Sequence, residues 1–592
     1  MKQVVAVLTA LAVTFGLSAC TPKPPAAGPV VEKFLGAIRD HDSATAASLL
    51  DHPEGAQDTI DKSWDGLQAD RLETSNVRVD ENRDQATAHY TMSWKLPKGR
   101  ELNYDDELTM SRTGNSWTIR WQPSVLQPQL GAHQHLELRG LPADRASVLG
   151  SDGAELLKPG FTYRLLVDTN KVTDKQQTAD AIAASVGKDG PSASDIAKAL
   201  DGAHGKYSVT VIADADAGRV RDALKDHPEV LFNKEDALVP TEPGFAPDVM
   251  PRVTQQVSDK LDGATGWKVV IANEWGGELQ DVEKTDPKPA PSVSVSLNKK
   301  VQKAADDALK SAPAGKQAMI VAIQPSTGAI LAVAQNAEAD KKGSVGLSGQ
   351  YPPGSGFKIV TAAAGAQHQG LTPDSTVGCP GTLNLYGRTV KNYNGFSLGD
   401  VPLSKAFAKS CNTTFADVST KLQPGELSDT AKQFGLGLDY DIPGLTTLTG
   451  SVPRGDEPLE RTESGYGQGA DLASPFGMAM VAATVAAGRT PTPYLIKGEE
   501  TKVNHQVLGV DPGVLDTVRA MMRKVVTEGT ARGVAGAGEV YGKTGEAEVN
   551  DGSHAWFDGY RGDLAFSTLV VYGGGSEISV ELTNKFLQNL DH

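Results

Sequence analysis

Pro353-Gly354-Ser355-Gly356-Phe357-Lys358 is the stretch that decides the fold of the C-terminal half of this 592-residue chain. It is followed by Ser410-Cys411-Asn412 and then by Lys543-Thr544-Gly545. On a helix, residues three apart share a face, so Ser355 and Lys358 can come within hydrogen-bond reach. A serine hydroxyl becomes a good nucleophile only when a base takes its proton, and a lysine with a lowered pKa can be that base. The stretch therefore predicts a nucleophilic serine at position 355.

The side chains that follow suggest how the lysine could act as a base. Burial and a nearby second cation both lower the pKa of a lysine, and Lys543 is the candidate cation beside Lys358. Ser410 would pass the proton on to a leaving amine. Asn412 carries an amide with both a donor and an acceptor, which could hold a substrate backbone.

The third pattern predicts a strand that lines a cleft. Thr544 would bind a terminal carboxylate of the substrate, and Gly545 would let another backbone approach closely. The backbone N–H groups of Ser355 and Glu546 would form the oxyanion hole, and each donor is worth ~3 kcal/mol in comparable enzymes. We therefore expect the chemistry of acyl transfer at this site.

Ser-x-x-Lys, Ser-x-Asn and Lys-Thr-Gly, in this order, form the pattern of penicillin-recognising acyl enzymes. Ser464-Gly465-Tyr466-Gly467-Gln468-Gly469 resembles the S-x-G-Q-G loop of penicillin-binding proteins, and Ala555–Tyr560 resembles their A-W-F-x-G-Y strand. The resemblance implies a substrate-binding role for Gly467, Gln468 and Gly469. It also implies a C-terminal domain over 293–592 with an antiparallel sheet flanked by helices.

The family forms peptide cross-links in peptidoglycan, so the resemblance implies a D,D-transpeptidase. Such an enzyme cleaves the terminal D-Ala from one stem peptide, passes the acyl group to an amine of another, and binds β-lactam antibiotics covalently. Residues 21–290 carry no recognisable glycosyltransferase motif, so a separate glycan polymerase is an expected partner.

The N-terminal half predicts two further domains of a multidomain α+β and α/β protein. Val31, Phe34, Leu35 and Ile38 follow a helical period, and residues 86–96 alternate as a half-buried strand does. With its Trp117-x-x-x-Trp121-x-Pro123 ending, the segment 29–130 resembles the cystatin-like domain of methicillin-resistance-type penicillin-binding proteins. Residues 131–292 resemble the elongated pedestal, or dimerisation, module of class B members. The chain as a whole therefore resembles a class B penicillin-binding lipoprotein.

The first 20 residues predict an export signal with a lipid attachment site. The apolar run Val4–Leu17 is short for a membrane span, and Leu17-Ser18-Ala19-Cys20 is similar to a bacterial lipobox. Cleavage would leave a lipidated Cys20, with 21–28 as tether, on the outer face of the cytoplasmic membrane. Plain secretion and an uncleaved helical anchor are the alternatives.

Composition excludes other functions. The formal net charge of -16 makes a nucleic acid an unfavourable partner. The sequence has no H-E-x-x-H motif and no paired cysteine spacing, so we expect neither a metal nor a cofactor. The mature part retains Cys379 and Cys411, which could form a disulfide or remain two buried thiols.

Other short patterns in the chain compete with this interpretation. Ser-x-x-Lys also occurs at 185–188 and 296–299, where the other two patterns do not follow, so both are expected to be coincidences. A nucleophile elbow needs glycine at Pro353, and a phosphate loop needs glycine at Ala537.

Three alternatives with the same serine stay open: a D,D-carboxypeptidase, a β-lactamase and a non-catalytic β-lactam sensor or scaffold. Residues 457–460, Glu-Pro-Leu-Glu, suggest the deacylating glutamate of a β-lactamase, although Arg461 stands where that class has asparagine. A surface acidic loop is the competing interpretation.

Glu546 departs from the family pattern, which usually has threonine after Lys-Thr-Gly. Residues two apart on a strand point the same way, so we expect Glu546 to face the cleft beside Thr544. The alternative is that its side chain turns to solvent or pairs with a cation.

Overall fold

The computed structural model describes residues 25–188 and 190–591 and contains two compact units. The first unit contains residues up to Ala143 and Gly263–Lys288, and the second contains Asp144–Asp262 and the chain from Pro289 onward. The predicted signal segment and Cys20 lie outside the described residues. Within the described ranges, no helix combines the length and apolarity needed to cross a bilayer.

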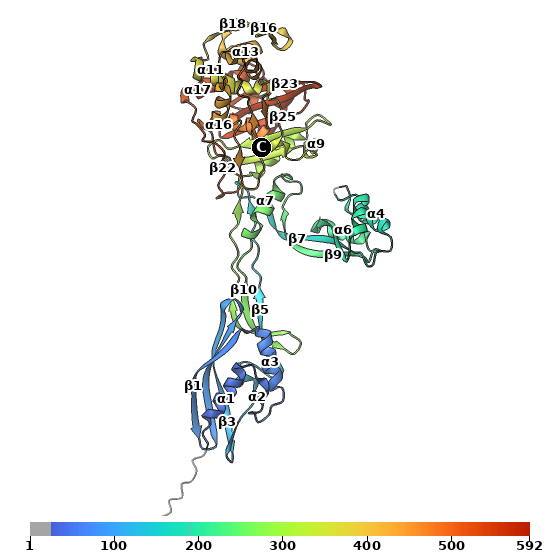
Figure 1. Cartoon of the computed structure of the whole chain (residues 1–592), viewed down its shortest axis with the longest axis vertical. Coiled ribbons are helices and arrows are strands. Elements are labelled where there is room, and N and C mark those ends of the chain that lie inside the picture. Colours follow the sequence, from blue (N-terminus) through green and yellow to red (C-terminus); the bar gives the residue numbers. More distant parts are fainter. Residues whose placement is uncertain (1–24, 189, 592) are drawn as a thin grey trace, which may run out of the picture. The chain divides into compact units, whose positions relative to one another are not determined.

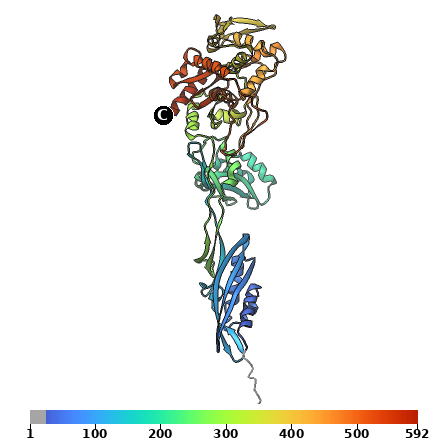
Figure 2. The ribbon, with the colours of Figure 1, turned by 90° about the vertical axis from the view of Figure 1, so that its left-hand side faces the viewer.

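The first unit is built on a four-stranded antiparallel sheet in the order β1-β2-β3-β4 (Figure 1). Every second residue of β2 from Ala86 to Leu96 is buried, as the period of two predicts, and Trp94 is completely buried. Three helices supply the other half of the core, seen beside the sheet in Figure 2. The bounds are α1 Gly28–Arg39, α2 Ser43–Ala47, α3 Ala56–Leu67, β1 Arg71–Asn82, β2 Gln85–Leu96, β3 Arg100–Thr113 and β4 Ser116–Ile119. The predicted first helix and the predicted strand over residues 86–96 are confirmed.

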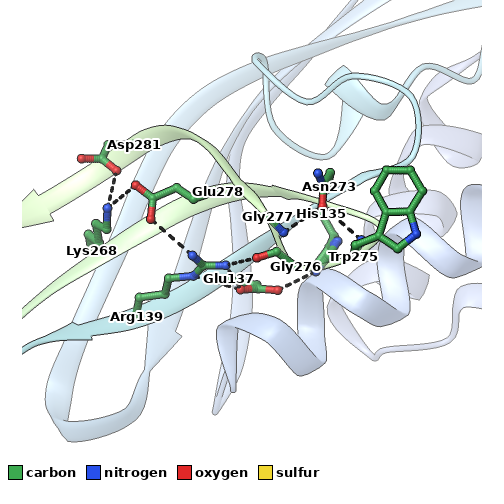
Figure 3. Close-up of polar contacts among 10 residues, drawn as sticks. All are labelled: His135, Glu137, Arg139, Lys268, Asn273, Trp275, Gly276, Gly277, Glu278 and Asp281. Carbon is green, nitrogen blue, oxygen red and sulfur yellow. Dashed lines mark hydrogen bonds and ion pairs between the residues drawn. The ribbon is translucent and has the colours of Figure 1, made fainter.

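A second sheet of this unit joins segments far apart in sequence. Strand β5 (Gln134–Leu141) pairs with β10 (Gly266–Asn273), which pairs with β11 (Glu278–Thr285). Arg139 binds the Glu137 carboxylate at 2.6 Å and the Gly276 carbonyl at 2.6 Å, and so fixes the turn between β10 and β11 (Figure 3).

This pairing divides the segment predicted as one pedestal module. Residues 131–143 and 263–288 fold with the N-terminal helices, because Leu136, Val269 and Ile271 enter the same apolar core as Trp94. The intervening residues 144–262 belong to the second unit.

Within that intervening segment, three antiparallel strands and three helices form a lobe with its own small core. The long strand β7 lies between β8 and β9, and the helices bury Ile182, Ile196 and Val220 against it. The bounds are β7 Glu155–Asp168, α4 Lys175–Val186, α5 Ala193–Gly202, β8 Lys206–Ala213, α6 Asp214–Ala223 and β9 Val230–Pro240.

The C-terminal part of the second unit contains a five-stranded antiparallel sheet in the order β14-β13-β25-β24-β23. Strands β13 and β14 form a hairpin at one edge of this sheet, and the strand with Lys543 lies at the opposite edge. Helices α8 and α18 pack together against the sheet, and α16, which is buried along nearly its whole length, also packs against it. The bounds are α8 Lys299–Leu309, β13 Ala318–Ile323, β14 Ile330–Gln335, α16 Pro475–Ala487, β23 Val540–Val549, β24 Gly552–Arg561, β25 Leu564–Val570 and α18 Glu577–Asp591.

Candidate active site

Ser355 lies in a 3-10 turn, Gly354–Phe357, that runs directly into helix α11 (Lys358–Gln369). Gly354 has φ +54°, and a Cβ there would lie 2.6 Å from the Glu546 carbonyl oxygen, so only glycine fits beside strand β23. The Lys358 Nζ is 3.0 Å from the Ser355 Oγ. The two residues predicted to share a helical face are thus in hydrogen-bond contact.

The surroundings of Lys358 suit a general base. Its side chain is fully buried, and Nζ lies 2.9 Å from the Ser410 carbonyl oxygen and 2.7 Å from the Asn412 Oδ1. Burial, followed by the positive charge of Lys543, holds the pKa of Lys358 well below its ordinary value. A neutral amine has two N–H bonds for these two acceptors. Its lone pair is then left for the proton of Ser355.

Ser410 connects the two lysines. It lies between α12 (Leu403–Ala408) and α13 (Asn412–Thr420), and its φ of +61° is an uncommon conformation for a residue with a side chain. The Oγ is 3.0 Å from the Lys543 Nζ and 3.3 Å from the Lys358 Nζ. A hydroxyl in this position can move a proton between the site and a leaving group.

A disulfide holds this loop. Cys411, the middle residue of Ser-x-Asn, is bonded to Cys379 at the end of strand β15 (Thr376–Cys379), and the two Cα atoms are 6.1 Å apart. Of the two possibilities left open by the sequence, the structure has the disulfide. The bond ties the loop that carries Ser410 and Asn412 to a strand 32 residues earlier.

Strand β23 carries Lys543, Thr544 and Gly545 along the free edge of the five-stranded sheet. Lys543 is fully buried, which lowers its pKa to about 7, and its Nζ also donates to the Thr544 carbonyl at 2.8 Å. A Cβ on Gly545 would lie 2.8 Å from the Pro353 carbonyl oxygen and 2.9 Å from the Gly356 nitrogen. Glycine is therefore required at position 545 because strand β23 approaches the turn of Ser355 closely there.

Two cavities meet at Ser355. One, of about 430 Å³, is also lined by Ser410, Asn412, Thr530 and Thr544. The second, of about 440 Å³, shares Ser355 and Asn412 but extends past Tyr466 and Gln468. The nucleophile therefore lies where two channels of substrate size join.

Glu546 lines both cavities, as the strand alternation predicts. Its carboxylate accepts a hydrogen bond from the Ser553 Oγ at 3.0 Å, and no cation within the described ranges pairs with it. Burial raises the pKa of Glu546, and the Ser553 hydrogen bond opposes that rise. The negative charges of Glu577 and Glu548 raise the pKa further.

The three loop residues with an implied substrate-binding role, Gly467, Gln468 and Gly469, differ in whether they reach a cavity. Gln468 lines the second cavity. Gly467 instead packs under the catalytic turn, where its carbonyl oxygen accepts from the Gly354 N–H at 2.9 Å and a Cβ would lie 2.1 Å from the Gly354 carbonyl oxygen. A Cβ on Gly469 would lie 3.2 Å from the Cβ of Glu463. Gly467 and Gly469 therefore contribute through close backbone packing beside the cavity, because neither has a side chain.

Sequence reasoning missed two groups at this site. Thr530 lines the first cavity with its hydroxyl 2.5 Å from that of Thr544, but it belongs to no motif. Asp558, the variable residue of Ala555–Tyr560, is completely buried and lies directly opposite Lys543 on the neighbouring strand. An acid inside an otherwise apolar strand was the available signal for Asp558.

The competing sites have structural roles. Ser185 donates to the Ile182 carbonyl and Ser296 to the Ile330 carbonyl, and both serines are buried. Glu457 and Glu460 form a capping box at the start of helix α15 (Pro458–Ser464). The suggested deacylating acid is therefore part of a helix N-terminus.

A buried serine–lysine pair, a Ser-x-Asn loop and a Lys-Thr-Gly edge strand around one cavity define the site of a penicillin-recognising serine enzyme. Residues 318–588 match the family model of the penicillin-binding protein transpeptidase domain, and residues 26–134 match that of the NTF2-like N-terminal transpeptidase domain. The chain therefore carries the transpeptidase domain of penicillin-binding proteins, and this pair of domains fits class B of that family.

Curated relatives match part of the chain. The peptidoglycan D,D-transpeptidase PbpA of Mycobacterium tuberculosis is 28% identical over 312 residues, which cover 45% of this chain and 63% of PbpA. MrdA of Acinetobacter baumannii, also a peptidoglycan D,D-transpeptidase, is 25% identical over 343 residues, with 50% of each chain covered. This chain thus spans between half and two thirds of the length of these relatives.

Solved structures support the fold. The penicillin-binding protein PBP2 from Helicobacter pylori, solved in complex with MreC, aligns with a TM-score of 0.57 and 18% identity, covering 77% of this chain and 99% of that one. A chain from a peptidoglycan synthase complex aligns with a TM-score of 0.55 and 22% identity, covering 79% and 94%. At these identities the likeness concerns the fold.

We predict that Cys379 and Cys411 resist iodoacetamide in the unreduced, denatured protein, as read by peptide mass mapping. Replacing both with serine should lower the free energy of unfolding by ~3 kcal/mol, because the bond closes a loop of 32 residues in the unfolded chain. As a control, a reductant should destabilise the wild type and leave the double variant unchanged. Alkylation of both thiols without reduction would contradict the disulfide.

We predict that Glu546→Thr accelerates acylation by an anionic penicillin roughly fivefold, about 1 kcal/mol. A carboxylate about 4 Å from the antibiotic's carboxylate costs between ~1 and ~4 kcal/mol, depending on the effective dielectric. The measurement is the second-order acylation rate, and the gain should shrink at high salt. Glu546→Gln, which removes only the charge, should also be faster. A rate for the threonine variant equal to or below that of wild type would show that Glu546 does not repel the antibiotic.

Proposed function

We propose that this chain is a peptidoglycan D,D-transpeptidase that is acylated on Ser355 by one stem peptide and transfers the acyl group to an amine of another. The observation that carries the proposal is the 3.0 Å contact between the Ser355 Oγ and a buried Lys358 of lowered pKa, at the junction of two cavities. The relatives' names as D,D-transpeptidases support it.

Acylation begins when Lys358 takes the Ser355 proton and the Oγ attacks the carbonyl carbon between the two terminal D-Ala residues. The negative oxygen is bound by the backbone N–H groups of Ser355 and Glu546, because an edge strand such as β23 keeps free donors. Lys358 returns the proton through Ser410 to the leaving nitrogen. The carbon–nitrogen bond then breaks and D-Ala departs.

Binding places the substrate for this step. The Thr544 and Thr530 hydroxyls, backed by Lys543, bind the terminal carboxylate, while the Asn412 amide and Gln468 hold the peptide that becomes the acyl group. In the second half of the reaction an acceptor amine attacks the ester, and its proton returns by the same route to Ser355. A β-lactam enters the first half and stays on Ser355, because no amine displaces it.

The alternatives differ in what removes the acyl group. In a D,D-carboxypeptidase or a β-lactamase the acceptor is water, and in a sensor or scaffold nothing turns over. Product analysis with lipid-linked substrate and a glycan polymerase separates them. Cross-linked dimers support the transpeptidase. Shortened monomers without cross-links support the carboxypeptidase. Rapid hydrolysis of penicillin supports the β-lactamase, and labelling of the serine without any product supports the sensor or scaffold.

We predict that a fluorescent penicillin labels Ser355 and that Ser355→Ala abolishes labelling. Lys358→Ala should slow acylation by roughly 10² to 10⁴, because the hydroxyl loses its general base. Ser185→Ala, in a Ser-x-x-Lys pattern outside the site, is the matched control and should label like wild type. Wild-type labelling of Ser355→Ala would refute the proposed nucleophile.

We also propose that the protein is anchored through a lipid on Cys20 at the outer face of the bacterial cytoplasmic membrane, where stem peptides, β-lactams and a separate glycan polymerase would meet it. The motif Leu17–Cys20 supports this placement. The net charge of -16 speaks against nucleic acid as a partner. The peptidoglycan synthase complex among the solved structures concerns other proteins, and it supports the expectation of a polymerase partner here.

Mass spectrometry of the native N-terminal peptide is expected to give Cys20 as the first residue, carrying acyl chains. Cys20→Ser is the control and should leave the protein uncleaved or released from membranes. An unmodified N-terminal peptide, or cleavage at another residue, would contradict lipidation.

A further inference from the structure

Asp558 is a buried acid that the mechanism above does not use. It lies in strand β24 and is completely buried, directly opposite Lys543 of β23 in the sheet register. Residues directly opposite in an antiparallel pair project from the same face with their side chains in reach of one another. Asp558 and Lys543 therefore share the face of the sheet that lies away from Thr544.

The contacts of Asp558 leave half of its carboxylate unused. Oδ1 accepts a hydrogen bond from the Ser567 Oγ at 2.7 Å, whereas Oδ2 has no hydrogen-bond partner among the described residues. Oδ2 lies 2.5 Å from the position that a Cβ on Gly356 would occupy. The acid thus lies directly beneath the turn that carries Ser355. A buried acid with one oxygen unpaired is costly, so its retention calls for a role.

The charges around Ser410 require a balance. Lys358 and Lys543 are both fully buried and contact the same Ser410 hydroxyl. Each amine also lies over a ring, Lys358 over Phe415 at 5.7 Å and Lys543 over Phe407 at 5.6 Å. One of the two lysines must be neutral to act as base, and the other must stay charged to keep it neutral.

We propose that Asp558 is a positioning residue that keeps Lys543 protonated and thereby leaves Lys358 as the free base. The inference rests on the proposed acyl transfer at Ser355. A charged Lys543 and an ionised Asp558 together carry no net charge, so with a neutral Lys358 the three buried groups have no net charge. Without the acid, the proton moves toward Lys358, which then cannot accept one from Ser355.

The direction of each electrostatic effect agrees with this arrangement. Burial lowers the pKa of Lys543, and the Asp558 charge opposes that fall. Burial raises the pKa of Asp558, while the Ser567 hydrogen bond and the Lys543 charge lower it. The groups that face one another here are Lys543 on β23, Asp558 on β24, Ser567 on β25 and Lys358 on α11. Because the two lysines and the acid titrate together, a pH profile reports the three groups as a whole.

The test is the pH dependence of penicillin acylation of the full chain. Acylation needs a neutral Lys358, which sets the acid limb, and a charged Lys543, which sets the alkaline limb. In Asp558→Asn both limbs should move to lower pH, the alkaline limb by about one, because a nearby negative charge raises the pKa of a lysine and its removal lowers that pKa. At pH 7 to 8 the rate should fall at least tenfold. A carboxyl that only fills space would give a lower rate with both limbs unmoved, which would overturn the proposal.

The Lys543→Arg background supplies the decisive comparison. A guanidinium stays charged without help, so Asp558→Asn should cost far less in this background than in wild type. An equal loss in both backgrounds would overturn the proposal. Asp563→Asn, an exposed acid in the turn after β24, is the matched control and should leave the profile unchanged.

Circular dichroism and a melting temperature establish that Asp558→Asn folds. If it does not, Ser567→Ala takes its place, because it removes the hydroxyl whose hydrogen bond lowers the pKa of Asp558. Its rate loss should again disappear in the Lys543→Arg background, and a loss that persists would count against the role of Asp558. A wild type that acquires no label on Ser355 contradicts the proposed function itself, whereas labelling with unmoved limbs contradicts only the inference.

Discussion

The Ser410 hydroxyl oxygen lies within 3.3 Å of the amines of two buried lysines, and the remainder of the site is arranged to make that contact possible. Two ammonium groups cannot share a buried hydroxyl at low cost, because their repulsion is strong where water is absent. Burial first, and then the charge of Lys543, lower the pKa of Lys358, so that a lysine can act as a base. The surrounding helices and strands fix three backbone segments so closely that neither lysine can turn away to solvent.

Each of those segments is held by a different physical device. Helix α11 begins at the turn of Ser355, and Gly354, Gly545 and Gly467 let the backbones around it come within contact distance. The Ser-x-Asn loop has a residue in the left-handed region, and the disulfide of Cys411 ties that loop to β15. Strand β23 is fixed by its register with β24. A strained residue persists only where its surroundings over-determine it, and the disulfide provides part of that constraint.

The catalytic residues can be predicted from the sequence because each motif is local. Ser355 and Lys358 are one helical turn apart, and Lys543 to Gly545 are consecutive. The period-two alternation of residues 86–96 likewise identifies β2. What escaped prediction depends on contacts between distant segments. The disulfide required the distance from Cys379 to Cys411, and the role of Asp558 required the pairing of β23 with β24. The division of residues 131–292 between two units follows from β5 pairing with β10, over 100 residues later in the chain.

Strand β23 explains how one short stretch can serve both recognition and catalysis. Side chains two apart share a face, so Thr544, Glu546 and Glu548 line the cavity, while Lys543 projects to the other face, where Asp558 lies. The side chains on the cavity face of β23 contact the substrate. Their charge can vary, as Glu546 shows, without altering the buried Lys543 and Asp558 on the other face. Lys543 and Asp558 on the buried face set which lysine carries the proton. Neither can be replaced alone, because a buried charge without its partner is costly. A slip of one residue in the register of β23 and β24 would exchange the two faces, which would bury the glutamates and expose the lysine. The pairing of these two strands therefore constrains substrate binding and proton transfer at once.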